Sequence, residues 1–415
     1  MAKVVPFKAV RYNTSRFGQD VTRFVAPPYD VIDGPAEKAL KEDRLNITHV
    51  TLGDEGDSYA TAAKRLRTWL DDGVLVADGD DAFYLYEQTF ESPDGAPVVR
   101  TGIIGLVRLE DFSKGVVLPH ERTIPKHKAD RLALMQAVRG QAEQVFMLYD
   151  DPSGDLERLI LELRKRGEEL RFVDPEGVHH RILKVGERAH VERISSLLAP
   201  LRLLIADGHH RYETALRYRD TRRAEERPDG EMPYDFIMAT LISFRNPGLV
   251  IYPTHRLVRG LDGAALGGLR AKLGEAFDLA DQEGPEGVAD ALAQARPDAV
   301  GAWAPGSGLA VLATPREEAA DPLGRLSVQV LQERVLKGML GYTQEMLDGK
   351  VGIEYVKGTD ASLAAMASGE HQACFFVKPP TPAQVMEVAS SGEKMPQKST
   401  YFFPKIWSGT LLHLF

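Results

Sequence analysis

The chain has 415 residues, of which 43% are hydrophobic and 27% are charged, a balance typical of globular proteins. Its formal net charge of −9 argues against a protein that coats nucleic acid or an anionic membrane, because both need a basic face. The single cysteine, Cys374, excludes a disulfide or a multi-cysteine zinc site within one chain. With no membrane-spanning apolar run and no signal-peptide core, we expect a soluble, cytoplasmic enzyme of two or three domains.

The first segment, residues 1–95, is expected to form an N-terminal α/β extension. In residues 57–71, Ala, Leu and Trp recur at helical spacing, which predicts an amphipathic helix. Residues 82–90 alternate in polarity and predict a strand. Two prolines in residues 25–32 fix a rigid loop that aims Asp30. We interpret this loop as a structural turn. The Asp30 carboxylate is a candidate to hold a residue of the functional site in position.

The second segment, residues 96–258, carries a loop that is dense in titratable side chains. This loop follows a predicted strand over residues 98–109 and is bracketed by prolines. One carboxylate, Glu121, stands there among cationic groups: His120, Arg122, Lys126, Lys128 and Arg131. Neighbouring cations keep a carboxylate ionised, as a general base requires, although they also lower its basicity. The alternative is that the loop is only the solvated cap of the next helix.

Farther along this segment, an apolar run, Leu203 to Ala206, ends abruptly and a helical run, Tyr212 to Glu226, follows it. The junction between this strand and this helix consists of Asp207, Gly208, His209, His210 and Arg211. A helix start leaves backbone N–H groups unpaired, and His and Arg side chains beside them make an anion site, most naturally for phosphate. Asp207 is a candidate to hold Mg²⁺ or to orient a histidine. The alternative is a plain turn with solvated histidines.

Other histidines lie in strand-like stretches of the same segment. His179 and His180 are expected to be exposed because the sequence gives them no evident partner. His255 and Arg256 follow an extended stretch and are candidates to line the same pocket as the turn.

The third segment, residues 259–415, is expected to form a C-terminal α/β subdomain. Residues 373–378 predict a strand, and Thr381 is expected to cap a helix that ends at Gly392. The loop that follows contains Lys398, Ser399 and Thr400. A cation, two hydroxyls and free backbone amides match phosphate oxygens, although the loop lacks the glycine spacing of a Walker A motif. The alternative is a basic surface loop.

Three stretches together resemble the signatures of the domain-of-unknown-function 1015 family: L-P-H-E-R-T, I-A-D-G-H-H-R-Y-E-T-A and M-P-Q-K-S-T-Y-F-F-P-K. The resemblance covers essentially the whole chain. Through its D-G-H-H-R turn that family resembles the ParB/sulfiredoxin-like superfamily, and within it the free L-serine kinases. Those enzymes carry P-H-E, V-D-G-H-H-R and a strand–K-x-P-T–helix–P-K-T-T segment in the same order. The counterparts here are Pro119–Glu121, Ala206–Arg211 and Lys378–Thr400.

The resemblance implies an α+β fold with a ParB/sulfiredoxin-like core in residues 96–258. It implies Glu121 as the catalytic base for the serine hydroxyl and the turn 207–211 as the phosphate and metal site. It also implies phosphate contacts from the loop 398–400. Two features depart from the kinases: residues 1–95 have no counterpart in them, and residues 397–400 read Q-K-S-T instead of P-K-T-T. Some relatives resemble pyrophosphate-dependent kinases.

We therefore expect a kinase that phosphorylates free L-serine, with Mg²⁺ and with pyrophosphate or an adenine nucleotide as donor. Catalytic roles fall to Glu121, Asp207, His209 and His210, and the segments near residues 120, 207 and 398 are expected to gather around one anionic ligand. We expect a monomer or homodimer that binds neither nucleic acid nor membrane. Two alternatives stay open: a ParB-like nucleotide-binding regulator without phosphoryl transfer, and a His/Asp metal hydrolase with ligands from His120, His209, His210 and His255.

Overall fold

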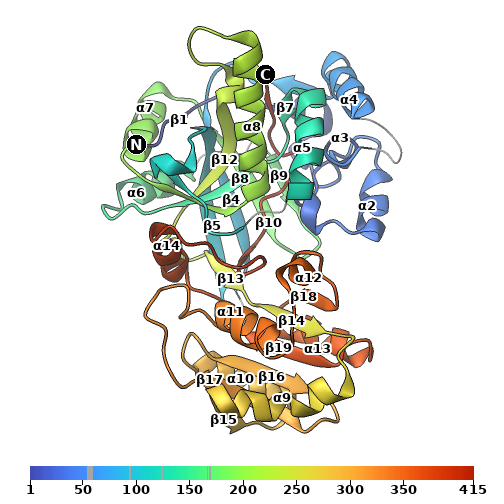
Figure 1. Cartoon of the computed structure of the whole chain (residues 1–415). Coiled ribbons are helices and arrows are strands. Elements are labelled where there is room, and N and C mark those ends of the chain that lie inside the picture. The colour runs from blue at the N-terminus through green and yellow to red at the C-terminus, as the bar shows by residue number, and fades with distance from the viewer. Residues whose placement is uncertain (54–58, 93–94, 123–124, 166, 168–169) are drawn as a thin grey trace. The chain divides into compact units, whose positions relative to one another are not determined.

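The computed structural model describes residues 1–53, 59–92, 95–122, 125–165, 167 and 170–415, without the side chains of residues 125–128. These residues form two compact units (Figure 1). Unit 1 consists of Met1–Pro119, Ile124–Val250 and Pro404–Phe415, and unit 2 consists of His120–Thr123 and Ile251–Phe403. The sequence segment 1–95 thus belongs to the same unit as most of the segment 96–258. Each unit is described by itself below.

A mixed sheet, nine-stranded within the described residues, forms the centre of unit 1. Its order is β6-β11-β8-β12-β5-β4-β10-β9, and β1 pairs with β5 outside this path. The strands are β1 (Val4–Val5), β4 (Phe83–Glu91), β5 (Pro97–Arg108), β6 (Val117–Leu118), β8 (Val145–Tyr149), β9 (Leu170–Val173), β10 (His179–Val185), β11 (Leu203–Asp207) and β12 (Phe236–Ser243). Because β11 pairs in parallel with β6 and antiparallel with β8, the strand before the Asp207 turn is an interior strand.

Unit 1 also contains helices and two pairs of short antiparallel strands. The helices are α1 (Thr14–Phe17), α2 (Gly34–Lys41), α3 (Thr48–Thr51), α4 (Ala60–Asp71), α5 (Pro125–Val138), α6 (Asp155–Leu163), α7 (Arg188–Leu198) and α8 (His209–Glu226). The two-stranded pairs are β2 (Val10–Tyr12) with β3 (Leu75–Ala77), and β7 (Gly140–Gln141) with β21 (His413–Leu414). No described helix has both the length and the apolar character that crossing a membrane requires.

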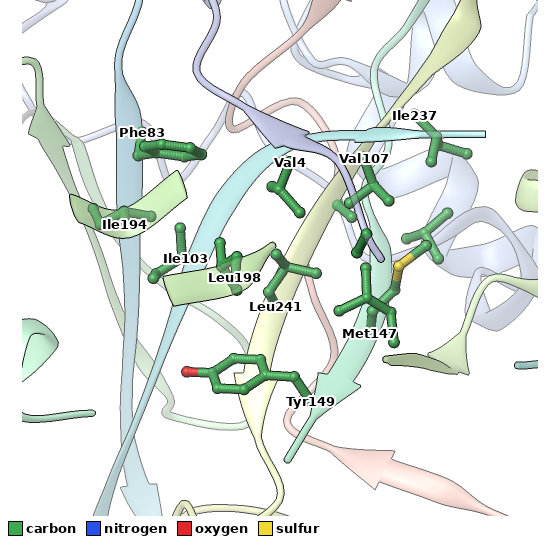
Figure 2. Close-up of a cluster of buried hydrophobic side chains, with 14 of the residues drawn as sticks. Val4, Phe83, Ile103, Val107, Met147, Tyr149, Ile194, Leu198, Ile237 and Leu241 are labelled. Atoms are coloured by element: carbon green, nitrogen blue, oxygen red, sulfur yellow. The ribbon is translucent and has the colours of Figure 1, made fainter. Parts of the chain in front are cut away.

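The core of unit 1 lies between the sheet and the helices packed on it. Figure 2 shows two side chains of α7, Ile194 and Leu198, close to side chains of the sheet: Phe83, Ile103, Met147 and Leu241. All six are almost fully buried. Burying one such side chain contributes roughly 1.5–3 kcal/mol, so this core supplies a rigid support for the end of β11.

The expected elements of unit 1 are present with small shifts. The predicted strands 82–90 and 98–109 are β4 and β5. The predicted helix 57–71 is α4, whose expected first residues, 57–58, lie outside the described residues. The helix after the turn begins at His209, earlier than the expected Tyr212, because Gly208 makes the whole change of direction by itself.

Unit 2 contains an antiparallel sheet with the order β15-β17-β16-β19-β14-β18. Its strands are β14 (Thr254–Val258), β15 (Phe277–Asp281), β16 (Val300–Ala304), β17 (Leu309–Pro315), β18 (Ile353–Lys357) and β19 (Ala373–Val377). The other elements are α9 (Gly263–Ala276), α10 (Gly284–Gln294), α11 (Ser327–Val330), a π-helical stretch (Leu331–Lys337), α12 (Gln344–Asp348), α13 (Thr359–Ala367), α14 (Pro382–Ser390), and the paired strands β13 (Val250–Tyr252) and β20 (Tyr401–Phe403).

Two sequence predictions for unit 2 are confirmed. The Thr381 hydroxyl accepts a hydrogen bond from the Gln384 N–H, and the Gln384 side chain accepts one from the Thr381 N–H, which completes a capping box on α14. Cys374 is buried in β19, and burial raises the pKa of its thiol. Strands and helices in both units make the fold α+β, as expected, whereas a ParB/sulfiredoxin-like core stays a prediction.

Candidate functional site

The turn between β11 and α8 depends on one glycine. Gly208 has φ 92° and ψ 28°, a left-handed conformation that L side chains rarely adopt. A Cβ at this position would lie 2.9 Å from Nε of Arg211, which folds back over the glycine. The turn therefore brings the Arg211 guanidinium and the backbone of the first turn of α8 together.

Arg211 is buried and held on several sides. Its Nη1 donates a hydrogen bond of 2.5 Å to the Gln144 carbonyl, and its Nη2 lies 3.8 Å from Oδ1 of Asp207. Burial lowers the pKa of Arg211, but the charges of Glu143, Asp207 and Asp30 outweigh it and raise the pKa above the usual value. The guanidinium is thus a permanent positive charge at the N-terminus of α8.

Lys405 is a residue of this cluster that the sequence analysis missed. Its Nζ lies 2.9 Å from Oδ2 of Asp207. The backbone around it is fixed, because Gln88 Nε2 donates to the Lys405 carbonyl at 2.8 Å and the buried Arg100 donates to the Pro404 carbonyl. The only available signal was its place at the end of the third motif, F-F-P-K.

His209 and His210, expected in the loop after β11, lie in the first helical turn of α8. His209 is buried and His210 is partly exposed. The plain-turn alternative expected two solvated histidines, and the burial of His209 contradicts that.

The donor set at Asp207 does not fit a protein-held Mg²⁺ ion. Mg²⁺ prefers a shell of oxygen ligands, whereas this carboxylate contacts an ammonium and a guanidinium. Within the described ranges, no three His, Cys, Asp or Glu side chains are grouped so that they could hold one metal ion. The turn offers cations and helix N–H groups, which suit an anion.

A second cluster, in unit 2, joins the first motif to the third. The Met395 N–H donates to the His120 carbonyl at 2.8 Å, and the Lys398 N–H donates to Oε1 of Glu121 at 2.9 Å. A main-chain donor has fewer conformations than a long cationic side chain, so this bond fixes the position of the Glu121 carboxylate.

Hydrogen bonds inside the same cluster use the polar side chains of the 398–400 loop. His120 is fully buried, and a bond of 3.0 Å joins its Nε2 to Oγ1 of Thr400. The Ser399 hydroxyl donates to the Pro396 carbonyl at 2.6 Å. In this structure both hydroxyls therefore stabilise the loop.

Arg256 holds the loop from the other side. Its guanidinium is buried, donates to the carbonyls of Gln397 and Lys398 at 3.4 and 3.2 Å, and lies 5.1 Å from the Tyr355 ring centre. Burial lowers the pKa of Arg256 to about 10. Lys398 has φ 57°, a left-handed conformation that is strained for a residue with a side chain. This conformation directs its N–H to Glu121 and its carbonyl to Arg256.

His255, the neighbour of Arg256, has a structural role. Burial and the adjacent guanidinium lower its pKa to about 3, so it is neutral at ordinary pH. Its Nδ1 accepts the Val377 N–H at 3.2 Å, which leaves Nε2 to donate to the Thr359 hydroxyl at 3.2 Å. These bonds tie β14 to β19 and α13.

The cationic groups expected around Glu121 have different outcomes. Arg122 is exposed, and its charge contributes to lowering the pKa of Glu333. The side chains of Lys126 and Lys128 lie outside the described residues. Arg131 belongs to unit 1, where it donates to the Thr51 carbonyl at 2.6 Å.

Of the three segments expected to gather, two are brought together. The segments near residues 120 and 398 form the cluster of unit 2. The turn 207–211 belongs to unit 1 and is joined there by Lys405. Asp30 also lies in unit 1, in the 3₁₀ turn Tyr29–Val31, and contributes to the charge around Arg211.

A profile described as "Protein of unknown function (DUF1015)" matches residues 4–329 of the chain. The chain belongs to the DUF1015 family. This confirms the family resemblance; the matched residues include the first two motifs, and the third, residues 395–405, lies beyond them. No curated protein matches this DUF1015 chain.

The DUF1015 chain also has matches among solved structures. One is a variant of free serine kinase in complex with AMP, at 16% identity and TM-score 0.37, covering 69% of this chain and 84% of that one. Another is a conserved hypothetical protein from Pyrococcus furiosus, at 17% and 0.36, covering 70% and 89%. A third is SbnI with a C-terminal truncation from Staphylococcus aureus, at 9% and 0.35, covering 74% and 85%. Similarity at this level does not establish a common fold or activity.

Proposed function

We propose that this protein transfers a phosphoryl group to the hydroxyl of a small molecule, and that the acceptor is free L-serine. The observation that carries the proposal is that the third motif contacts both of the other motifs. Its Lys398 N–H holds the Glu121 carboxylate of the first motif, and its Lys405 ammonium pairs with Asp207 of the second. Each cluster combines residues from motifs that are remote in sequence and contains one part of the chemistry that a kinase needs.

The proposed role of the unit 2 cluster is to activate the acceptor. A serine hydroxyl is a poor nucleophile at neutral pH, so its attack on phosphorus needs positioning and a proton acceptor. We assign that role to Glu121, because the Lys398 N–H holds its carboxylate in a fixed position and a carboxylate can accept a proton. Thr400 and Ser399 keep the loop in shape through His120 and Pro396, so we now assign their hydroxyls to positioning.

The proposed role of the unit 1 cluster is to bind the phosphates of the donor. Arg211, Lys405, His209 and His210 surround a helix N-terminus, where fixed donors stabilise negative charge. Asp207 orients the two cations. Mg²⁺ enters such sites bound to phosphate oxygens, so we expect it to arrive with the donor. The donor is an adenine nucleotide or pyrophosphate.

The test is direct detection of the product. The full-length protein is incubated with L-serine, Mg²⁺ and, in turn, ATP, ADP or pyrophosphate, and phosphoserine is followed by ³¹P NMR. The proposal expects phosphoserine with at least one donor and none without the protein. Absence of phosphoserine with all three donors contradicts the assignment of serine as the acceptor.

A further inference from the structure

A pocket in unit 1 lies beside the Asp207 turn and shares only Arg211 with the residues of the proposed function. It lies between α3, α5 and α8 and has a volume of about 50 Å³. One water molecule needs roughly 10–15 Å³ on the same measure, so the pocket has room for more than a single water. Much of its wall is apolar and includes Leu134, Met135, Val138 and Ile237.

Charges of both signs line the same pocket. Glu143 lies between two guanidinium groups: Nη1 of Arg131 is 3.9 Å from its Oε2, and its charge raises the pKa of Arg211. Oε1 of Glu143 accepts hydrogen bonds from the Tyr29 N–H at 3.4 Å and the Ser408 hydroxyl at 3.3 Å. Oε2 makes only the longer contact with Arg131 within the described residues, which leaves it able to accept a closer donor.

A buried hydroxyl in the pocket has no partner. Thr214, in α8, is 1% exposed, and its Oγ1 forms no hydrogen bond with any described residue. Buried polar groups are nearly always hydrogen bonded, so an unpaired hydroxyl that lines a pocket points to a bound polar group. Since this hydroxyl can donate or accept, it suits a carboxylate as well as an amine.

We infer that this pocket binds a zwitterionic α-amino acid with an aliphatic side chain. The ammonium group would donate to Oε2 of Glu143, and the carboxylate would accept from the Thr214 hydroxyl and the guanidinium of Arg211. The side chain would pack against Leu134 and Met135. The small polar side chain of serine cannot pack against this apolar wall, so the site is distinct from that of the proposed acceptor.

Arg211 connects the pocket to the Asp207 turn. Its side chain lines the pocket and also lies over Gly208, close to Asp207. An amino acid bound to Arg211 therefore acts on a residue to which the proposed function assigns donor binding. The binding itself does not depend on that function, and it is tested without an activity assay.

The experiment is isothermal titration calorimetry of the full-length protein with L-leucine as probe. Three analogues each lack one recognised part: 4-methylpentanoate has no ammonium, 3-methylbutylamine has no carboxylate, and L-serine has no aliphatic side chain. We expect saturable binding of L-leucine, with each analogue at least about tenfold weaker. Binding of 4-methylpentanoate as tight as that of L-leucine overturns the zwitterion assignment, and no saturable L-leucine binding up to millimolar concentrations overturns the site.

Two variants locate the binding. Thr214→Val keeps the shape and removes the unpaired hydroxyl, so we expect an unchanged or higher Tm and L-leucine binding weaker by about fivefold or more. Thr221→Val is the matched control, because that hydroxyl lies on the same helix and donates to the Arg217 carbonyl. Val138→Trp fills the pocket and should abolish binding. L-leucine binding unchanged in both Thr214→Val and Val138→Trp overturns the proposal.

Discussion

The ammonium of Lys405 lies 2.9 Å from Oδ2 of Asp207, although 198 positions separate the two residues in the chain. The side chains are 12% and 21% exposed, so this ion pair is largely shielded from solvent. Asp207 also lies 3.8 Å from Arg211. A single carboxylate thus orients two cations at the start of α8, which is the arrangement that the donor phosphates would meet.

Replacing Lys405 by Met should weaken donor binding and slow turnover. The variant removes one of two oriented cations, and losing one such stabilising group typically costs about 10²–10³-fold in turnover. Lys405→Arg should keep part of the activity because the charge remains. The measurement is kcat and the donor KM from phosphoserine formation. Lys3→Met, at an exposed lysine paired with Glu231, is the control, and equal kinetics for Lys405→Met and this control would rule out a role for Lys405.

Gly208→Ala should destabilise the fold and disturb the turn. Alanine is strained at φ 92°, and its Cβ would meet the Arg211 guanidinium at 2.9 Å. We expect a loss of about 1–3 kcal/mol in the free energy of unfolding, measured by urea denaturation. Gly267→Ala is the matched control: this glycine lies within α9, where a Cβ meets nothing within 4 Å, so alanine should be neutral or stabilise by roughly 0.5–1 kcal/mol. A Gly208→Ala variant as stable as the control would contradict the account of the turn.

Arg256→Lys should lower kcat more than it changes the donor KM. Lysine keeps the charge but loses the planar fork that reaches the carbonyls of Gln397 and Lys398. The loop would then hold the Lys398 N–H less firmly against Glu121, and small displacements of a base cost about tenfold or more in rate. Arg296→Lys, where the arginine pairs with Asp298 in the same unit, serves as control. If the loss appears only in the donor KM, Arg256 does not act through Glu121.

Stability should fall as the pH drops below about 6.5, partly because of His255. Its pKa is about 3 in the folded protein against 6.5 for an ordinary histidine, so the unfolded chain binds this proton first. The stabilisation is complete above pH 6.5 and is lost as the pH falls toward 3, by up to about 1.4 kcal/mol per pH unit. Urea midpoints at pH 7 and 5 measure it. The His255→Gln variant should show a flatter dependence, and the exposed His179→Gln should not; identical slopes in all three would contradict the burial argument.

The local features of the site were accessible from sequence. The β11–α8 junction, the Asp207–Arg211 turn and the Thr381 cap depend on residues close together in the chain, and the structure has all three. Propensity, capping and turn chemistry act over such short separations, which is why these patterns can be interpreted without a fold.

The partners that come from distant elements were not accessible. His180 was expected to be exposed, but it is buried, and a hydrogen bond of 2.9 Å joins its Nδ1 to the hydroxyl of Tyr86 in β4, 94 positions away. The sheet pairs β10 with β4, and the sequence around His180 carries no trace of that pairing. Lys405 was missed for the same reason, since only the fold brings it to Asp207.

The roles assigned to the 398–400 loop also changed with the structure. From the sequence, the Ser399 and Thr400 hydroxyls were assigned to phosphate binding because hydroxyls can donate to phosphate oxygens. In the structure they form hydrogen bonds with the Pro396 carbonyl and His120 instead. A side chain's chemistry shows what it can bind, but competing partners inside the protein decide what it does bind.

The most direct test of the central claim is the rate of phosphoserine formation by the wild type and Glu121→Gln at saturating L-serine and donor. Glutamine keeps the size and accepts the Lys398 N–H but cannot take the serine proton. We predict a loss of about 10²–10⁴-fold in kcat with an unchanged donor KM, while Glu387→Gln, at an exposed carboxylate in unit 2, keeps full activity. Equal turnover by the wild type and Glu121→Gln would contradict the account.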